Sequence, residues 1–263
     1  MKKPTTETLT MNAIPNRAKA FVAVWMLAAL ALAAYALASR PTVGTKEFVV
    51  LLVIAVFASR LKLRLPGLNG NMSVNVPFIL VAFTYLNLTE ALLVASASGF
   101  AQCLPKQGGK QKPVQVLFNV CTIAIASGLA SLVVSHGERW RELLSSGPTL
   151  LAVAAVVYFL ANTLPVATII ALSERTKILS AWSSIFHLSF PYYVASAGIG
   201  SMVITASRHV GWQTPVLVLP VMYAIYRCYR LYFGRIVAMA RAAGLIGLER
   251  QAVAIELTSA KTV

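Results

Sequence analysis

Long apolar runs recur along the chain, and they limit its fold more than any other feature of the sequence. A helix needs about 20 consecutive apolar residues to cross the hydrocarbon core of a bilayer. Most of the runs meet that length, and 58% of all residues are hydrophobic. The sequence therefore predicts an all-α polytopic membrane protein with about eight hydrophobic segments. These segments span residues 20–39, 43–59, 74–88, 89–104, 114–135, 149–173, 182–206 and 212–233.

Two neighbouring segments are short, because residues 74–104 offer 31 positions for two crossings. One long tilted helix is the competing interpretation, and the excess of Lys and Arg on the cytoplasmic side of membrane proteins distinguishes the two. A hairpin places 18 of the 23 Lys and Arg on one side, whereas a single helix divides them ten to thirteen. We therefore expect a short hairpin, with arms that either cross fully or are re-entrant. The same count predicts cytoplasmic N- and C-termini.

This topology divides the chain into three parts. Residues 1–19 form a basic cytoplasmic arm, residues 20–233 the transmembrane domain, and residues 234–263 a basic cytoplasmic helix or tail. The formal net charge is +15, and the basic residues are scattered between apolar runs. That distribution favours anionic lipid headgroups over nucleic acid as the partner.

A polar stretch with a period of two precedes the short hairpin. Basic and apolar residues alternate over 60–65, Pro66-Gly67 follows, and polar residues alternate again as far as Asn75. This pattern predicts a small cytoplasmic β-ribbon within residues 60–76, with Asn75 as the N-cap of the next helix. The ribbon is either an interfacial anchor on lipid phosphates or a ligand-binding lip of amides and backbone N–H groups. Its candidate contacts with lipid or other anions are Arg60, Lys62 and Arg64.

Four polar side chains inside the predicted spans are candidates for ligand binding, because polar groups are costly in hydrocarbon. Prolines at 165, 191 and 220 interrupt the last three spans, and each frees a backbone carbonyl one turn earlier. These groups either line a polar cavity or hydrogen-bond between helices without a ligand. The four candidates are Asn119, Asn162, His187 and Tyr192. The small-residue spacings Ala124–Gly128 and Ser196–Gly200 predict close helix packing.

The sequence contains no recognisable catalytic constellation. There is no Asp, and no HExxH, GxSxG or CxxC motif occurs. The three cysteines lie in or beside apolar segments, with no spacing typical of a zinc site. We therefore expect a non-enzymatic protein with no cofactor and no bound metal.

The last hydrophobic segment continues into a basic sequence, YRCYRLYFGR, at residues 226–235. Arg227, Arg230 and Arg235 recur between apolar residues, as in a helix that leaves the membrane through the headgroup layer. We expect these arginines to contact anionic lipid. The helix itself either lies on the membrane surface or dimerises or docks a partner.

Four short motifs follow one another along the chain: Leu65-Pro66, Ser73 to Phe78, Phe118-Asn119 and Tyr229 to Arg235. Over roughly residues 45–240 they resemble the multi-pass N-terminal sensor regions of bacterial signalling proteins, of the kind joined to GGDEF, HD-GYP or histidine-kinase modules. In those relatives a catalytic domain follows the exit helix, whereas this sequence ends 28 residues after Arg235. The resemblance implies a sensor or scaffold in a bacterial inner membrane. Such a module binds a small or lipid-like ligand and signals through its exit helix to a separate partner.

The small-residue helical layout is also similar to the substrate-binding membrane subunits of vitamin transporters. That alternative predicts an ATPase as the partner, whereas the sensor predicts a cyclase or kinase. A homodimer is compatible with both.

Overall fold

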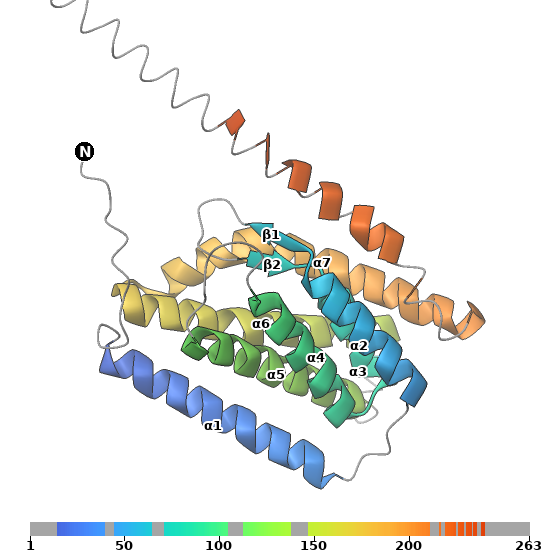
Figure 1. Ribbon diagram of the computed structural model, residues 1–263, viewed down its shortest axis with the longest axis horizontal. Helices are drawn as coiled ribbons and strands as arrows, with labels where there is room; N and C mark the ends of the chain where they lie inside the picture. The colour runs from blue at the N-terminus through green and yellow to red at the C-terminus, as the bar shows by residue number, and fades with distance from the viewer. Residues whose placement is uncertain are drawn as a thin grey trace, which may run out of the picture.

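Helices and a small ribbon make up the described part of the chain (Figure 1). The computed structural model describes residues 15–39, 45–64, 71–104, 113–137 and 147–210, and part of the last hydrophobic segment between 216 and 239. The helices are α1 (Asn16–Ala38), α2 (Thr45–Ser59), α3 (Val76–Tyr85), α4 (Leu88–Cys103), α5 (Pro113–Ser135), α6 (Gly147–Glu174) and α7 (Ile178–Val210). Each of them covers one predicted apolar segment.

The ribbon consists of β1 (Lys62–Arg64) and β2 (Asn71–Ser73), which pair antiparallel with Leu63 opposite Met72. The turn predicted at Pro66-Gly67 lies outside the described residues, as do the N-terminal arm before residue 15 and the tail after residue 239.

Helix α3 lies at the centre of the molecule. All residues from Val76 to Phe83 are buried, and the helix packs against α2, α4, α5, α6 and α7. Lipid is as apolar as these side chains, so close packing rather than transfer out of water holds such a helix in a membrane protein. Pro77 lies in the first turn, where a missing N–H costs nothing.

The short hairpin is formed by α3 and α4. Leu86 is extended, and Asn87 begins α4 with a capping box: its side chain accepts from Glu90 N–H, and the Glu90 carboxylate accepts from Asn87 N–H. The predicted hairpin therefore reverses at residues 87–90. At 1.5 Å per residue, α3 is about 15 Å long and α4 about 24 Å, so both are shorter than a hydrocarbon core of about 30 Å.

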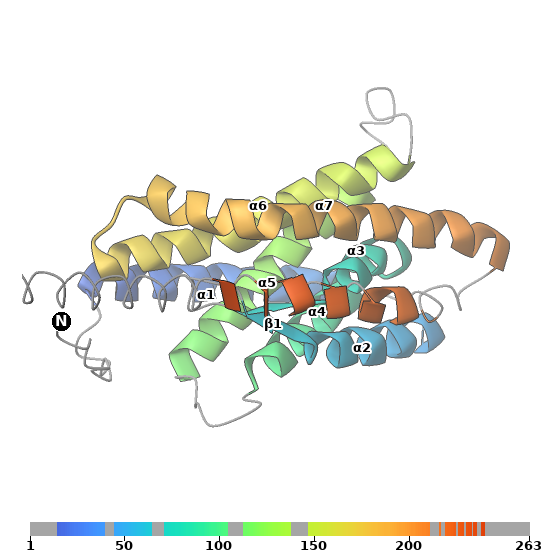
Figure 2. The ribbon, with the colours of Figure 1, turned by 90° about the horizontal axis from the view of Figure 1, so that it is seen from above.

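The longer helices carry the membrane character of the chain. Within the described residues, three helices are long and apolar enough to cross a membrane: Asn16–Ala38, Pro113–Ser135 and Thr149–Glu174. The count of about eight membrane segments remains a prediction. Figure 2 shows α6 and α7 running beside each other for most of their length, with α5 crossing obliquely, and these three helices pack in sequence order.

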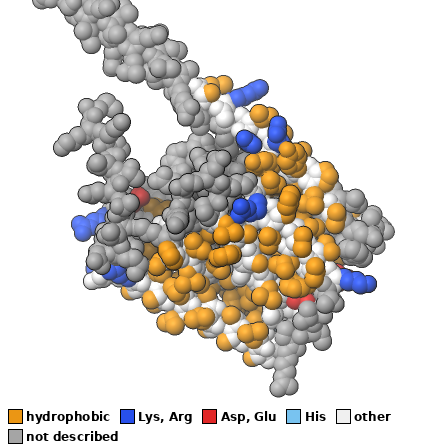
Figure 3. All heavy atoms as spheres, in the orientation of Figure 1, with side chains coloured by type: hydrophobic (Ala, Val, Ile, Leu, Met, Phe, Trp, Pro, Cys, Tyr) orange, Lys and Arg blue, Asp and Glu red, His pale blue; other side chains and the backbone are white. Residues whose placement is uncertain are grey.

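Large apolar side chains cover the outside of the bundle. Val24, Leu27, Val53 and Phe57 are 61–65% exposed, and Figure 3 shows hydrophobic side chains over most of the described part of one face. An apolar surface of this extent is typical of a protein covered by lipid.

Small residues set the distances between the helices. A side chain at Gly128 in α5 would collide with Leu32 of α1. A Cβ at Gly200 in α7 would lie 3.3 Å from Leu151 Cδ2 in α6 and 3.7 Å from Leu80 Cβ in α3. Both predicted small-residue spacings therefore mark close contacts. Trp25 Nε1 of α1 also donates a 3.1 Å hydrogen bond to Thr122 of α5, which fixes these two helices in register.

Candidate functional site

The base of the ribbon is attached to α7 by the side chain of Tyr192. The phenol donates a 2.8 Å hydrogen bond to the Ser73 carbonyl and accepts a 3.4 Å bond from Val76 N–H. Tyr192 is 2% exposed. One side chain therefore pairs the backbone at the end of β2 and at the start of α3, where backbone groups lack ladder or helix partners. We call this arrangement the ribbon junction.

A second set of bonds ties the ribbon junction to α4. Ser73 Oγ donates to Asn75 Oδ1 over 2.7 Å, and Asn75 Nδ2 donates to Ser98 Oγ over 3.1 Å. Asn75 occupies the N-cap position of α3, but its side chain makes no capping bond. The predicted N-cap position is therefore confirmed, while the side-chain amide joins the ribbon to α4. All three side chains are buried, where an unpaired polar group is costly.

The ribbon junction lies near the middle of α7. Tyr192 is about 21 Å from the N-terminal end of this helix and about 27 Å from its C-terminal end, at 1.5 Å per residue. The ribbon therefore meets α7 about halfway along this helix, beside the buried helix α3.

An aromatic cluster lies next to the ribbon junction, where α3, α6 and α7 meet. At its centre Asn162 Nδ2 donates a 2.8 Å hydrogen bond to the Tyr193 hydroxyl, and Trp182 Nε1 donates a 3.1 Å bond to Thr163. The ring of Tyr193 contacts that of Tyr192, with centroids 5.9 Å apart. The cluster consists of Phe83, Tyr158, Phe159, Trp182, Phe186, Phe190, Tyr192 and Tyr193.

Two prolines add polar backbone groups beside this cluster. Pro165 lies inside α6 and Pro191 inside α7. Each ring lacks an N–H, so the carbonyls of Ala161 and His187 lose their usual helical donors. The cluster is therefore apolar in bulk, with a few polar groups, which is the composition of a typical small-molecule site.

The four side chains predicted to bind a ligand do not lie together in one site. Asn162 and Tyr192 are linked through Tyr193. Asn119 lies elsewhere, with Nδ2 3.8 Å from Cys103 Sγ of α4. His187 is exposed, and its Nδ1 lies 2.7 Å from the Ser183 carbonyl of its own helix.

Sequence reasoning missed Ser73, Ser98 and Tyr193. Ser73 belongs to the alternating polar stretch, so its participation could have been inferred. Ser98 and Tyr193 carry no local signal, because their partners come from distant helices.

The predicted lipid-contact residues divide into two groups. Arg60 is half-buried and donates a 3.3 Å hydrogen bond from Nη1 to the Ala101 carbonyl of α4, whereas Arg227, Arg230 and Arg235 are exposed. Lys62 and Arg64 lie on β1, with side chains outside the described set.

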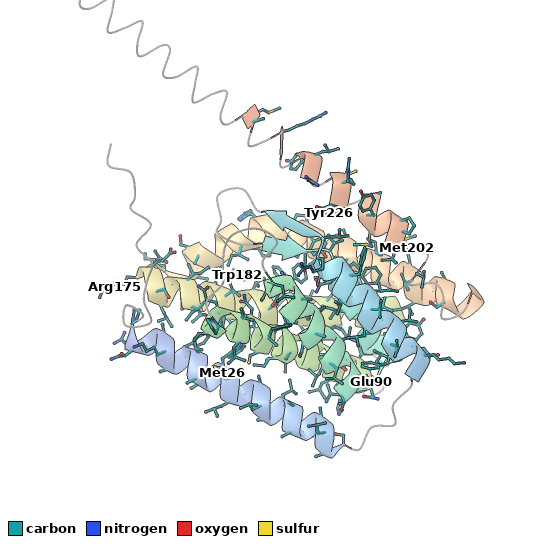
Figure 4. All side chains as sticks on the ribbon, viewed as in Figure 1. Met26, Glu90, Arg175, Trp182, Met202 and Tyr226 are labelled. Atoms are coloured by element: carbon teal, nitrogen blue, oxygen red, sulfur yellow. The ribbon has the colours of Figure 1, made fainter. Side chains whose placement is uncertain are left out.

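The last segment packs on the core through the residues before these arginines. Met222 and Tyr226 are 1% and 8% exposed and belong to the same buried cluster as Val74 and Val76. Figures 1 and 2 place this segment beside β1 and the adjoining end of α2, and Figure 4 marks Tyr226 there.

Comparison with known families shows to which family the chain belongs. The sequence matches the MASE9 family over residues 8–233. The chain belongs to the MASE9 family. MASE families are membrane-associated sensor domains of signalling proteins, so the MASE9 match supports a membrane sensor module. No curated protein and no solved structure matches the chain. The MASE9 match includes the ribbon junction, the aromatic cluster and Tyr226.

Proposed function

We propose that this MASE9 chain is a non-enzymatic, multi-pass sensor of the bacterial inner membrane. In this proposal a small or lipid-like ligand changes the ribbon junction, and the change reaches a separate signalling protein through the last helix. The observation that carries the proposal is the bond from Tyr192 to Ser73. It connects the helix that leads into the last segment with the ribbon on which that segment lies.

The proposed topology places both ends of the chain at the cytoplasmic face. Trp25 and Thr122 hydrogen-bond at equivalent positions along α1 and α5. The excess of Lys and Arg lies in the arm, the ribbon and the C-terminal part. The last segment therefore leaves the membrane on the side where soluble signalling proteins reside.

The proposed ligand site is the aromatic cluster around Asn162. The bond to Tyr193 supplies one amide and one hydroxyl in apolar surroundings, and the carbonyl freed by Pro165 lies one residue before Asn162. A ligand that competes for these groups would separate Tyr193 from Asn162. Because Tyr192 is the adjacent residue, that movement acts directly on the ribbon junction.

The proposed output is the exposed basic face of the last segment. Met222 and Tyr226 attach this segment to the core, while Arg227, Arg230 and Arg235 face outwards. Anionic lipid headgroups satisfy these arginines, and a signalling protein or a second copy of the chain is the proposed receiver. The family match favours this sensor over a transporter component.

Native mass spectrometry of the gently extracted protein tests the ligand site. We expect the wild-type chain to carry a non-covalently bound mass that Asn162→Leu loses. The matched control is Thr168→Val on the same helix, because the Thr168 hydroxyl bonds the Leu164 carbonyl of α6. If the wild-type chain carries no bound mass, or if Asn162→Leu keeps it, the ligand site is wrong. Co-purification with an ATPase instead of a cyclase or kinase would contradict the sensor.

A further inference from the structure

The ends of α2 and α4 meet at Arg60, which directly follows α2. Its Nη1 donates to the Ala101 carbonyl, two residues before the end of α4, over 3.3 Å. A positive charge at this position also interacts favourably with the negative C-terminal end of the α4 helix dipole. A guanidinium has five N–H donors in a fixed fork. The bond to Ala101 uses one of them.

The end of α4 is recessed relative to its neighbour α5. Asn119 Nδ2 of α5 lies 3.8 Å from Cys103 Sγ, at the last residue of α4. Asn119 is the seventh residue of α5, so α5 extends about 9 Å beyond the end of α4.

Helix α1 projects in the same way as α5. The ring of Phe21 contacts that of Phe118, with centroids 6.2 Å apart, and Phe21 is the sixth residue of α1. The start of α1 therefore lies about 7 Å beyond this contact. The end of α4 that Arg60 contacts therefore lies below the starts of α1 and α5, and this difference in level forms a step.

The bilayer beside α2 has to follow this step. Helix α2 has 15 residues, so it is about 22 Å long, shorter than the hydrocarbon core. Val49, Val53 and Phe57 are 50%, 61% and 64% exposed along it. A short apolar helix draws the bilayer inward and thins it locally. Headgroups beside α2 are then brought to the level of Arg60.

We propose that an anionic phospholipid binds at this step, with its phosphate against the Arg60 guanidinium and its acyl chains along the exposed face of α2. Guanidinium and phosphate match in charge and in planar donor geometry. The net charge of +15 favours an anionic headgroup over a zwitterionic one. This site is separate from the aromatic cluster and does not depend on the proposed ligand there.

The test compares lipids retained by the full chain in nanodiscs of mixed phosphatidylglycerol and phosphatidylcholine, measured by native mass spectrometry. We expect the wild type to retain phosphatidylglycerol preferentially, and Arg60→Gln to retain about tenfold less, the effect of losing one charge-assisted hydrogen bond. Arg60→Lys keeps the charge and should restore part of the retention. The matched control is Lys177→Gln, because Lys177 is an exposed basic residue in the turn between α6 and α7.

Equal retention in the wild type and Arg60→Gln would overturn the proposal, and so would an equal loss in Lys177→Gln. A second measurement uses the wild type alone, in case Arg60→Gln does not fold. Adding phosphatidylglycerol to detergent-solubilised protein should raise the melting temperature, whereas phosphatidylcholine should not. A rise that inorganic phosphate reproduces would assign the site to a free anion and contradict the lipid.

Discussion

The phenol of Tyr192 in α7 donates a 2.8 Å hydrogen bond to the carbonyl of Ser73, 119 positions earlier in the chain. Both residues are buried. The bond joins a ribbon end, the first turn of the central helix and the middle of a long helix at one point. A substitution at this point therefore removes contacts of several elements at once.

Tyr192→Phe should destabilise the protein by about 1–3 kcal/mol, because it leaves the Ser73 carbonyl and Val76 N–H buried without the phenol. Reversible unfolding in mixed micelles measures the change. Tyr223→Phe is the control, since Tyr223 is 50% exposed on the last segment. A Tyr192→Phe variant as stable as this control would show that the bond is not structural.

Replacing each of two buried serines in neighbouring helices by alanine should change the stability in opposite directions. Ser98 receives the amide of Asn75, so Ser98→Ala should cost about 1–3 kcal/mol by leaving that amide unpaired. Ser127 of α5 is 0% exposed, and its hydroxyl has no hydrogen-bond partner among the described residues. Ser127→Ala should therefore leave the stability unchanged or raise it. Equal losses in both variants would contradict the assigned bonds.

Gly128→Val should separate α1 from α5, because the added side chain meets Leu32. Overpacking of this kind costs about 1–3 kcal/mol. Leu32→Ala in the same chain should restore part of that loss, and a double-mutant cycle in thermal unfolding measures the coupling. Additive effects of the two substitutions would show that they do not meet.

Asn162→Ala should lower the stability more than His187→Ala, because only Asn162 bonds a side chain of another helix. Asn162 bonds the Tyr193 hydroxyl in the aromatic cluster, so its removal should cost about 1–2 kcal/mol. His187 bonds a carbonyl of its own helix and is exposed, so its removal should change the stability by less than about 0.5 kcal/mol. The reverse order in chemical denaturation would contradict this placement.

The apolar runs predict the helices well because each helix is a local property of its own sequence. The reversal at Asn87 and Glu90 is also local, since a capping box needs only neighbouring residues. The strands β1 and β2 fall within the range that the alternation indicates.

The ribbon junction could not be predicted in the same way. The hydrogen bonds between Tyr192 and Ser73 and between Asn162 and Tyr193 depend on how α6 and α7 pack. No short sequence pattern encodes that packing. Arg60 shows the same limit. Its charge predicts an anion, but its observed partner is the backbone carbonyl of Ala101, which has no sequence signature.

The central claim is that the ribbon junction sets the position of the last segment. It is tested most directly by the distance between spin labels at Leu27 and Leu231, which are 65% and 62% exposed, after replacement of the three native cysteines. We predict that Tyr192→Phe shifts or broadens the distance distribution in nanodiscs, while Tyr223→Phe leaves it as in the wild type. An unchanged distribution in a folded Tyr192→Phe variant would contradict the claim.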